Sequence, residues 1–244
     1  ADGKRVLLYI LVEFLGSAML GMIQAILRTT NERSLGYLFF PFFVWAAYAV
    51  CYRASGGHLN PILSIASLLR LDKHENYSYA AVILYIPAQF AGFFVGVLCQ
   101  WWFDQYANQL RFKPKTDGDY WWSEATGYEF FVSIVFVMIW LLQTGQTTPV
   151  SRDAGTQSFI ISITYGTLVA LSHRWTGGSL NPAYAFAQDF WDQVDDGEED
   201  AFKFFGVYVG ATLAGMAVSL LLYNFLFIKA HDTESYEKRE IGKA

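Results

Sequence analysis

Two stretches of this chain share five of their eight residues: Ser55-Gly56-Gly57-His58-Leu59-Asn60-Pro61-Ile62 and Thr176-Gly177-Gly178-Ser179-Leu180-Asn181-Pro182-Ala183. In each, a hydroxyl residue and two glycines are followed by a variable residue and then by Leu-Asn-Pro. One Asn-Pro pair is an ordinary turn or helix start and indicates little. Two copies of the longer pattern, 121 residues apart, indicate an internal repeat. Residues 55–62 are termed the first box below, and residues 176–183 the second box.

The composition is typical of a membrane protein. Of the 244 residues, 54% are hydrophobic and only 16% are charged, whereas a soluble domain carries about a quarter charged residues. The formal net charge of −5 and the scattered basic residues argue against a nucleic-acid partner. Cys51 and Cys99 both lie in apolar runs and offer neither a disulfide framework nor metal-ligand spacing. We therefore expect a chain that folds within a lipid bilayer.

Six apolar segments approach or exceed the roughly 20 residues that a spanning helix needs. They cover residues 6–27, 35–52, 77–103, 125–143, 157–172 and 202–228. The first is too long for a signal-peptide core and contains Glu13, so we treat it as part of the mature fold. Two further segments, 60–71 and 181–191, begin with Asn-Pro and are too short to cross. The sequence thus predicts an all-α membrane protein with six transmembrane helices and two re-entrant half-helices.

Other residue pairs extend the repeat. Glu13-Phe14 reappears as Glu129-Phe130, and the pair Gln89/Gly92 has a weaker counterpart in Thr212/Gly215. The order is the same each time, which indicates homologous halves at about residues 5–110 and 120–228. Three spans per half is an odd number, so the second half enters the membrane from the opposite side, as an inverted repeat. We expect one domain over residues 1–228, followed by a charged tail over residues 229–244.

The charged residues give an orientation. Six spans place both termini on one side of the membrane, and that side collects ten Lys and Arg residues against seven on the other. This bias favours cytoplasmic termini. Seven acidic residues crowd positions 189–200, which we predict to be a loop before the sixth span. A solvated loop explains them, and cation attraction or partner docking is the alternative.

Each box has the chemistry of a pore loop. Paired glycines let an extended backbone turn its carbonyls to one side, which is tolerated at membrane depth only beside water or protein. Asn at the N-cap holds the helix start while its NH2 remains a donor, and Pro suits the first helical position. Two half-helices then aim their positive dipole ends at the midplane. Such a site would orient water by its oxygen and oppose cations and protons.

The ionisable residues near the boxes have two interpretations. A glutamate within a span is a functional-site hypothesis, so Glu13 and Glu129 could relay protons. We favour the alternative that each carboxyl accepts hydrogen bonds from the amides of one box. His58 and Ser179 occupy the same position in the two boxes, where a loop contact and pore lining are equally plausible.

These motifs resemble the aquaporin, or major intrinsic protein, family over about residues 5 to 228. The resemblance rests on Val12-Glu13-Phe14-Leu15-Gly16, Gln89-Phe90-Ala91-Gly92, Glu129-Phe130 and the two boxes. It implies one pore per protomer for water and small neutral solutes, commonly in a homotetramer within the lipid bilayer. Contacts with other membrane proteins are a further expectation. The resemblance implies no cofactor and no metal.

The expected selectivity filter departs from the family pattern. Orthodox members have Arg directly after the second Asn-Pro-Ala, where this chain has Tyr184. The resemblance places the other filter positions at Phe40, Val169 and Gly178. Tyr184 could close the constriction, or the small residues could leave an apolar passage. Arg174 or Arg53 is the candidate replacement for the missing charge. Ile62 in the first box is a second departure, and the two together resemble the unorthodox, superaquaporin-like branch.

Two functions from different classes follow. The preferred one is a passive channel for water and small uncharged solutes such as glycerol, ammonia or hydrogen peroxide. The alternative is a channel-derived structural subunit with an occluded pore, motivated by Tyr184 and the acidic segment. An intramembrane enzyme is disfavoured because no Ser/His/Asp or Cys/His constellation recurs, so we expect no catalytic residues.

Overall fold

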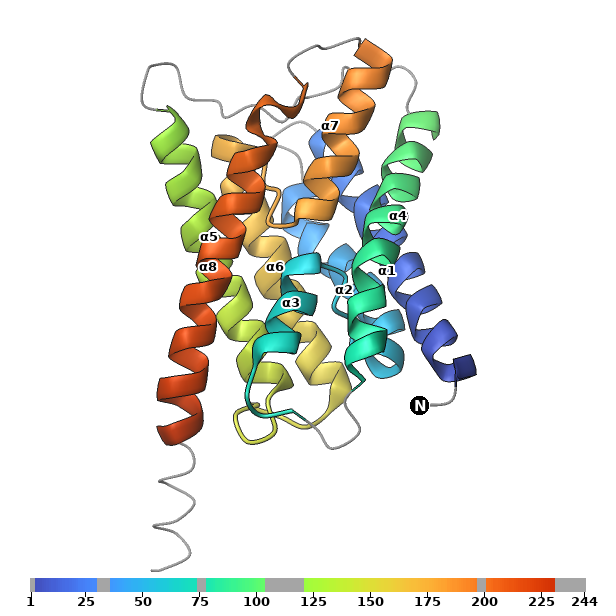
Figure 1. Ribbon diagram of the computed structural model, residues 1–244. Helices are drawn as coiled ribbons and strands as arrows, with labels where there is room; N and C mark the ends of the chain where they lie inside the picture. Colours follow the sequence, from blue (N-terminus) through green and yellow to red (C-terminus); the bar gives the residue numbers. More distant parts are fainter. Residues whose placement is uncertain (1–2, 30–35, 74–77, 104–120, 197–200, 231–244) are drawn as a thin grey trace, which may run out of the picture.

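The computed structural model describes residues 3–29, 36–73, 78–103, 121–196 and 201–230, and these are the residues discussed below. Their regular secondary structure is helical, and no strand occurs among them (Figure 1). In chain order the helices are α1 (Gly3–Thr29), α2 (Gly36–Ser55), α3 (Pro61–Leu69), α4 (Tyr79–Phe103), α5 (Trp121–Thr144), α6 (Ala154–Thr176), α7 (Pro182–Asp196), the 3-10 turn η1 (Ala201–Phe204), α8 (Phe205–Leu222) and the π-helical turn η2 (Tyr223–Phe227).

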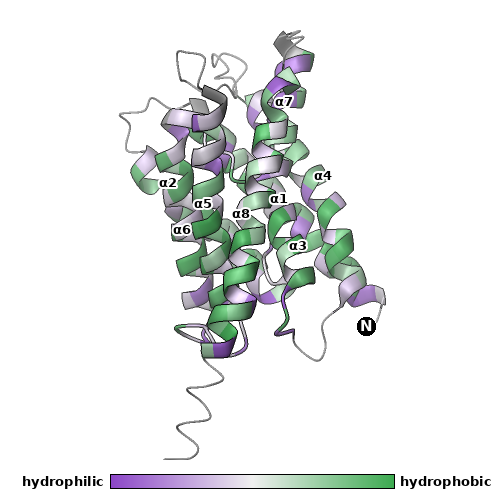
Figure 2. Ribbon diagram, turned by 60° about the vertical axis from the view of Figure 1, so that its left-hand side comes forward, coloured by the Kyte–Doolittle hydropathy of each residue, from purple (hydrophilic) through white to green (hydrophobic). Residues whose placement is uncertain are grey.

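Six of these segments are long and apolar enough to cross a membrane, which confirms the predicted number of spans. They are Gly3–Leu27, Gly36–Ser55, Tyr79–Phe103, Ser123–Thr144, Ala154–His173 and Ala201–Ala230. Large apolar side chains such as Leu8, Phe131 and Leu221 are about 60% exposed on the outside of the bundle. Figure 2 shows hydrophobic residues along the long helices of the bundle. This outer surface is suited to contact with lipid, because in water the same side chains would form a large exposed apolar patch.

The short helices α3 and α7 enter the bundle from opposite ends and begin near its middle (Figure 1). Each starts at the proline of an Asn-Pro pair, Pro61 or Pro182. The half-helices expected from the sequence are therefore present, and their N-termini face one another at the centre of the molecule.

The predicted ends of the half-helices need correction. Helix α7 runs to Asp196 instead of ending at residue 191, so much of the expected acidic loop 189–200 is helical. Asp189 and Asp192 are only 1% and 3% exposed. Gln188 Nε2 donates a hydrogen bond to Asp192 Oδ1, at 3.1 Å, and Trp191 stacks on Trp101 of α4 at 5.8 Å. One bond within the helix and one tertiary contact with α4 thus stabilise the helix past the point where its composition suggests a loop. Residues 197–200 lie outside the described residues.

Glycines repeat the same close helix contact in both halves of the chain. A Cβ on Gly92 of α4 would contact the backbone oxygen of Phe14 in α1. A Cβ on Gly215 of α8 would lie 2.7 Å from the corresponding oxygen of Phe130 in α5. Both glycines therefore let two helix backbones approach, which is the usual role of small residues between spanning helices. The α1–α4 and α5–α8 pairs are thus built alike.

Candidate pore and its two Asn-Pro boxes

The two boxes share one unusual backbone conformation. Both glycines of each box have positive φ, from 58° to 91°. Leu59 and Leu180 also have positive φ, of 47° and 46°. Among the described residues, no other residue except glycine has a positive φ. Glycine adopts this region without steric cost, whereas leucine does so only where its surroundings compensate. The leucines are therefore held in place by contacts that the rest of each box supplies.

Glu13 of α1 anchors the first box. Its carboxylate oxygens accept hydrogen bonds from Ser55 Oγ at 2.6 Å, from the backbone amides of His58 and Leu59 at 2.9 and 2.8 Å, and from Gln89 Nε2 at 2.8 Å. The side chain has no exposed surface. All four partners donate, so the group acts here as a pure acceptor, which is what an ionised carboxylate offers.

Glu129 of α5 has the equivalent position at the second box. It accepts hydrogen bonds from Thr176 Oγ1 at 2.5 Å and from the Leu180 amide at 3.2 Å. Thr212 is the counterpart of Gln89 in the second half of the chain. Its hydroxyl, however, donates a hydrogen bond to the backbone oxygen of Tyr208 in its own helix, at 2.6 Å. The second box therefore lacks the amide bridge that Gln89 provides to the first.

The two asparagines join the boxes to each other. Asn60 Oδ1 accepts from the Ile62 amide at 3.0 Å, and Asn181 Oδ1 accepts from the Ala183 amide at 3.0 Å, so each caps its own half-helix. Each Nδ2 then crosses to the opposite box: Asn60 donates to the Leu180 oxygen and Asn181 to the Leu59 oxygen, both at 2.9 Å. The leucines with left-handed backbone are the residues whose carbonyls accept these crossed bonds. The strain at both leucines is offset by this reciprocal pairing.

A cavity of about 780 Å³ leads toward the boxes from one end of the bundle. This end holds the last turn of α2, the end of α3 and the connection between α5 and α6, and the cavity is termed the vestibule. Ser55, Gly56 and His58 of the first box line it. The His58 ring lies edge-on between Tyr85, at 5.3 Å, and Trp140, at 5.2 Å. Asn60 and Asn181 lie deeper and are at most 1% exposed, so in this conformation the vestibule stops short of them.

The four expected filter residues, Phe40, Val169, Gly178 and Tyr184, are all buried within the bundle. Gly178 packs against α6 so closely that a Cβ would lie 2.5 Å from the Val169 oxygen. The Tyr184 ring approaches Phe93 of α4 at 6.0 Å. Phe40, Val169 and Tyr184 are at most 2% exposed. Tyr184 itself has no exposed surface in this conformation.

The proposed replacement of the missing filter charge by Arg53 is wrong. Arg53 lies in the last turn of α2, 13 residues beyond Phe40, which is roughly 20 Å along a helix at 1.5 Å per residue. Its side chain is exposed at the vestibule end. The side chain of Arg174, the other candidate, lies outside the described residues.

Sequence reasoning missed two polar residues that contact the second box. Gln24 Nε2 of α1 donates to the Gly178 oxygen at 2.8 Å and to the Ser179 oxygen at 3.2 Å. Tyr165 of α6 donates from its hydroxyl to Gln24 Oε1 at 2.8 Å. The sequence did contain a signal for Gln24, because it is a polar residue within an apolar span. Polar groups within a span are energetically costly and usually have a function.

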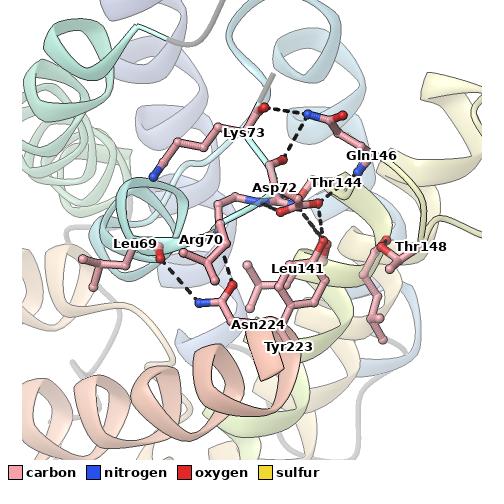
Figure 3. A network of polar contacts seen from close by, with 12 residues as sticks. Leu69, Arg70, Asp72, Lys73, Leu141, Thr144, Gln146, Thr148, Tyr223 and Asn224 are labelled. Carbon is pink, nitrogen blue, oxygen red and sulfur yellow. Dashed lines mark hydrogen bonds and ion pairs between the residues drawn. The ribbon is translucent and has the colours of Figure 1, made fainter. Parts of the chain in front are cut away.

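A second missed cluster closes the edge of the vestibule, where α3 ends (Figure 3). The buried guanidinium of Arg70 forms hydrogen bonds to both oxygens of Asp72, at 2.8 and 3.0 Å, to Thr144 Oγ1 at 2.7 Å and to the Tyr223 hydroxyl at 2.8 Å. The Tyr223 hydroxyl in turn donates to Asp72 at 2.6 Å. This cluster, termed the Arg70 network, connects the end of α3 to α5 and to the π-helical turn η2. π-Helical turns often mark such special contacts.

The Arg70 network also affects the ionisation of Asp72, which lies outside the spanning helices. Burial raises its pKa, but the hydrogen bonds and charge of Arg70, together with bonds from Tyr223 and the Gln146 amide, outweigh that effect. The pKa of Asp72 is therefore below its usual value of 3.8. The carboxylate stays ionised at neutral pH.

Six spanning helices and two half-helices that meet through crossed asparagines define a class of membrane channel. The chain matches the family described as Major intrinsic protein over residues 5–223, and it belongs to that family. Its members are channels and not enzymes. The chain is therefore an integral, multi-pass membrane protein of a family that conducts water or small neutral solutes.

Individual relatives agree with this membership. The "Glycerol uptake facilitator protein-like 6" of Lactiplantibacillus plantarum is 29% identical over 180 residues, covering 71% of this chain and 79% of that protein. The "Probable aquaporin AqpM" of Archaeoglobus fulgidus is 28% identical over 194 residues, covering 75% and 74%. Among solved structures, the aquaglyceroporin from Plasmodium falciparum has the same fold, with a TM-score of 0.80 at 17% identity over 93% of this chain and 99% of that one.

Proposed function

We propose that the protein is a passive channel for water and for small uncharged solutes, with glycerol, ammonia and hydrogen peroxide as candidates. The observation that carries this proposal is the reciprocal pairing of Asn60 and Asn181 at the meeting point of two half-helix N-termini. Each asparagine NH2 has two donor hydrogens and uses one of them in the hydrogen bond to the opposite box. The remaining donors and the two positive helix ends suit the oxygen of a passing neutral molecule.

The same arrangement opposes ions and protons. About half a unit of positive charge at each helix N-terminus repels cations, and water held by its oxygen cannot pass a proton along a continuous chain. Glu13 and Glu129 act in this proposal as anchors of the boxes and not as proton relays. Their carboxylates are already occupied by donors from the boxes.

The filter residues support neutral solutes. Phe40, Val169, Gly178 and Tyr184 contribute no charge and one phenolic hydroxyl. The two curated relatives bear the names of a glycerol facilitator and an aquaporin, and such solutes are in keeping with an uncharged passage. We expect Tyr184→Arg to reduce glycerol permeability while sparing that of water, measured on one preparation with both solutes. Unchanged selectivity would place the filter at other residues.

Stopped-flow shrinkage of proteoliposomes tests the channel itself. Reconstituted protein should raise osmotic water permeability several-fold over protein-free vesicles, with no rise in proton leak measured by an internal pH dye. The matched control is Asn181→Leu, which has a similar volume and no donor and should lower the permeability. Water permeability equal to that of protein-free vesicles, from correctly folded protein, would contradict the proposal.

A second candidate is a structural subunit with an occluded pore. Its specific support is that Tyr184 has no exposed surface and Phe40 and Val169 have almost none. Folded protein that conducts no solute, yet is recovered with other membrane proteins, would favour it. We also propose that the channel form is a homotetramer, which native mass spectrometry in detergent measures directly.

A further inference from the structure

Gln24 and Tyr165 form a clasp over the second box. Gln24 reaches from α1 and donates both amide hydrogens to the oxygens of Gly178 and Ser179. Tyr165 reaches from α6, donates to Gln24 Oε1 at 2.8 Å and lies 3.5 Å from the Ser179 oxygen. Both side chains are at most 1% exposed. Two helices from different halves of the chain thus meet on one short stretch of backbone.

The backbone oxygens that the clasp occupies have a special position. At membrane depth an irregular backbone must satisfy its polar groups through protein or through water in a cavity. The first box meets this requirement beside the vestibule, which Gly56 and His58 line. The second box meets it through the side chains of Gln24 and Tyr165 instead. The two halves therefore differ: one box faces an aqueous cavity, and the other is covered by protein.

The clasp also stands directly beyond the paired asparagines. The Tyr165 hydroxyl lies close to the Asn181 side chain, and Tyr48 and Tyr184 are near it. The Tyr165 ring packs on Phe136 of α5 at a centroid distance of 5.0 Å. Along α6, Tyr165 precedes Val169, one of the expected filter residues, by one helical turn.

We propose that Tyr165, held by Gln24, is the narrowest point of the conducting pathway and sets the largest solute that can pass. This inference rests on the proposed channel function. Displacement of the ring must break its bond to Gln24 and its contact with Phe136, and a larger solute needs a larger displacement. Tyr184 and the other filter residues then form a second, wider narrowing, in place of the main constriction that the sequence places there.

Identical substitutions at Tyr165 and Tyr184 test which of the two side chains forms the narrower constriction. Tyr165→Val, Tyr184→Val and the double variant should be reconstituted at equal protein density and assayed for water and glycerol permeability. We expect Tyr165→Val to raise the ratio of glycerol to water permeability about tenfold and to reach at least half the value of the double variant. Tyr184→Val should raise it less. Tyr165→Phe, which keeps the ring and loses the bond to Gln24, should give a rise of two- to threefold.

The possible results separate this inference from the channel function. A silent wild type with a conducting Tyr165→Val would support the constriction and contradict an open wild-type channel. A conducting wild type with an unchanged Tyr165→Val would overturn the constriction and leave the channel function standing. A larger effect of Tyr184→Val, or an effect only in the double variant, would also overturn it. The Tyr165→Phe result guards against misfolding, because that variant retains the packing on Phe136.

Discussion

Single buried side chains determine the shape of the backbone at the centre of this molecule. Glu13 accepts four hydrogen bonds, and two of them come from consecutive backbone amides of the first box. A backbone with three left-handed residues within four positions, Gly56, Gly57 and Leu59, would not persist without such partners. One carboxylate therefore replaces the regular secondary structure that would otherwise satisfy these amides.

Glu13→Gln tests this anchoring. Glutamine keeps one acceptor oxygen and turns an NH2 toward groups that are themselves donors, so at least one buried amide loses its partner. We expect a loss of about 2–4 kcal/mol in stability, since unsatisfied buried donors and lost charged hydrogen bonds cost about this much. Thermal unfolding in detergent measures the effect.

Two further variants serve as comparisons for the stability loss expected of Glu13→Gln. Glu129→Gln should cost less, because no amide bridge equivalent to that of Gln89 is present at the second box. Glu124→Gln, on the exposed first turn of α5, should change stability by no more than about 0.5 kcal/mol. Equal losses at all three positions would contradict a specific anchor.

At the scale of elements, the fold depends on how closely spanning helices approach and on how the half-helices are tied down. Gly92 and Gly215 permit backbone contact between α1 and α4 and between α5 and α8. The Arg70 network holds the end of α3, and the asparagines hold its beginning. A half-helix that cannot span the bilayer is thus fixed at both ends by side chains from other elements.

Gly215→Ala should weaken the α5–α8 pair. Its Cβ would lie 2.7 Å from the Phe130 oxygen, and overpacking of this kind costs about 1–3 kcal/mol. Gly210→Ala is the control on the same helix, because a Cβ there meets nothing within 4 Å. It should be neutral or slightly stabilising, since alanine favours helix over glycine. Unfolding temperatures of the two variants, measured side by side, decide between these expectations.

Asp72→Asn tests the Arg70 network through pH. The pKa of Asp72 is lowered in the folded protein, so the stability it contributes is present above the usual pKa of 3.8 and is lost as pH falls through the lower, folded value. From about pH 8 to about pH 5 the variant should be less stable than the wild type by a constant amount, about 2–4 kcal/mol. Below pH 4, roughly, the two should converge. A difference that changes between neutral pH and about pH 5 would assign the dependence to another group.

At the scale of the whole molecule, the two ends of the bundle differ although the two halves form an inverted repeat. One end opens into the vestibule beside the first box, and the other is covered at the second box by Gln24 and Tyr165. Helix α7 also extends well past the length of α3, with Asp189 and Asp192 buried along it. The two halves share one plan and have diverged in how each mouth is built.

The orientation of these ends can be measured with two matched cysteines. Val150 and Val194 are 82% and 59% exposed. Val150 lies in the connection between α5 and α6 and Val194 near the end of α7, and these two segments lie at opposite ends of the bundle (Figure 1). We expect the vestibule end, with its excess of Lys and Arg, to face the cytoplasm. A membrane-impermeant maleimide applied to intact cells should then label Val194→Cys, and Val150→Cys only after permeabilisation. The unsubstituted chain, with its own Cys51 and Cys99, is the background control. The reverse labelling pattern would invert the assignment.

Much of the fold could be predicted from the sequence, because the signals for spanning helices and half-helices lie in short stretches of the chain. Runs of apolar residues predict spans by length alone, and the repeated Asn-Pro motif predicts both half-helices, their caps and the inverted halves. Even the bounds of the six spans agree with the structure to within a few residues at most ends. The end of α7 did not follow, because the stacking of Trp191 on Trp101 of α4 is a tertiary contact that helps to stabilise a helix that its acidic composition disfavours.

The sequence by itself determined the class of protein, the family and the residues that had to meet at the centre: Glu13, Asn60, Glu129 and Asn181. Only the tertiary structure decided which side chains from other helices contact the second box. Gln24 and Tyr165 lie 141 residues apart and form one hydrogen bond across the bundle, a pairing that no periodicity or motif encodes. Arg70 and Tyr223, 153 residues apart, meet in the same way. Such contacts depend on the packing of helices from both halves, because each partner alone is only a polar residue in an apolar segment.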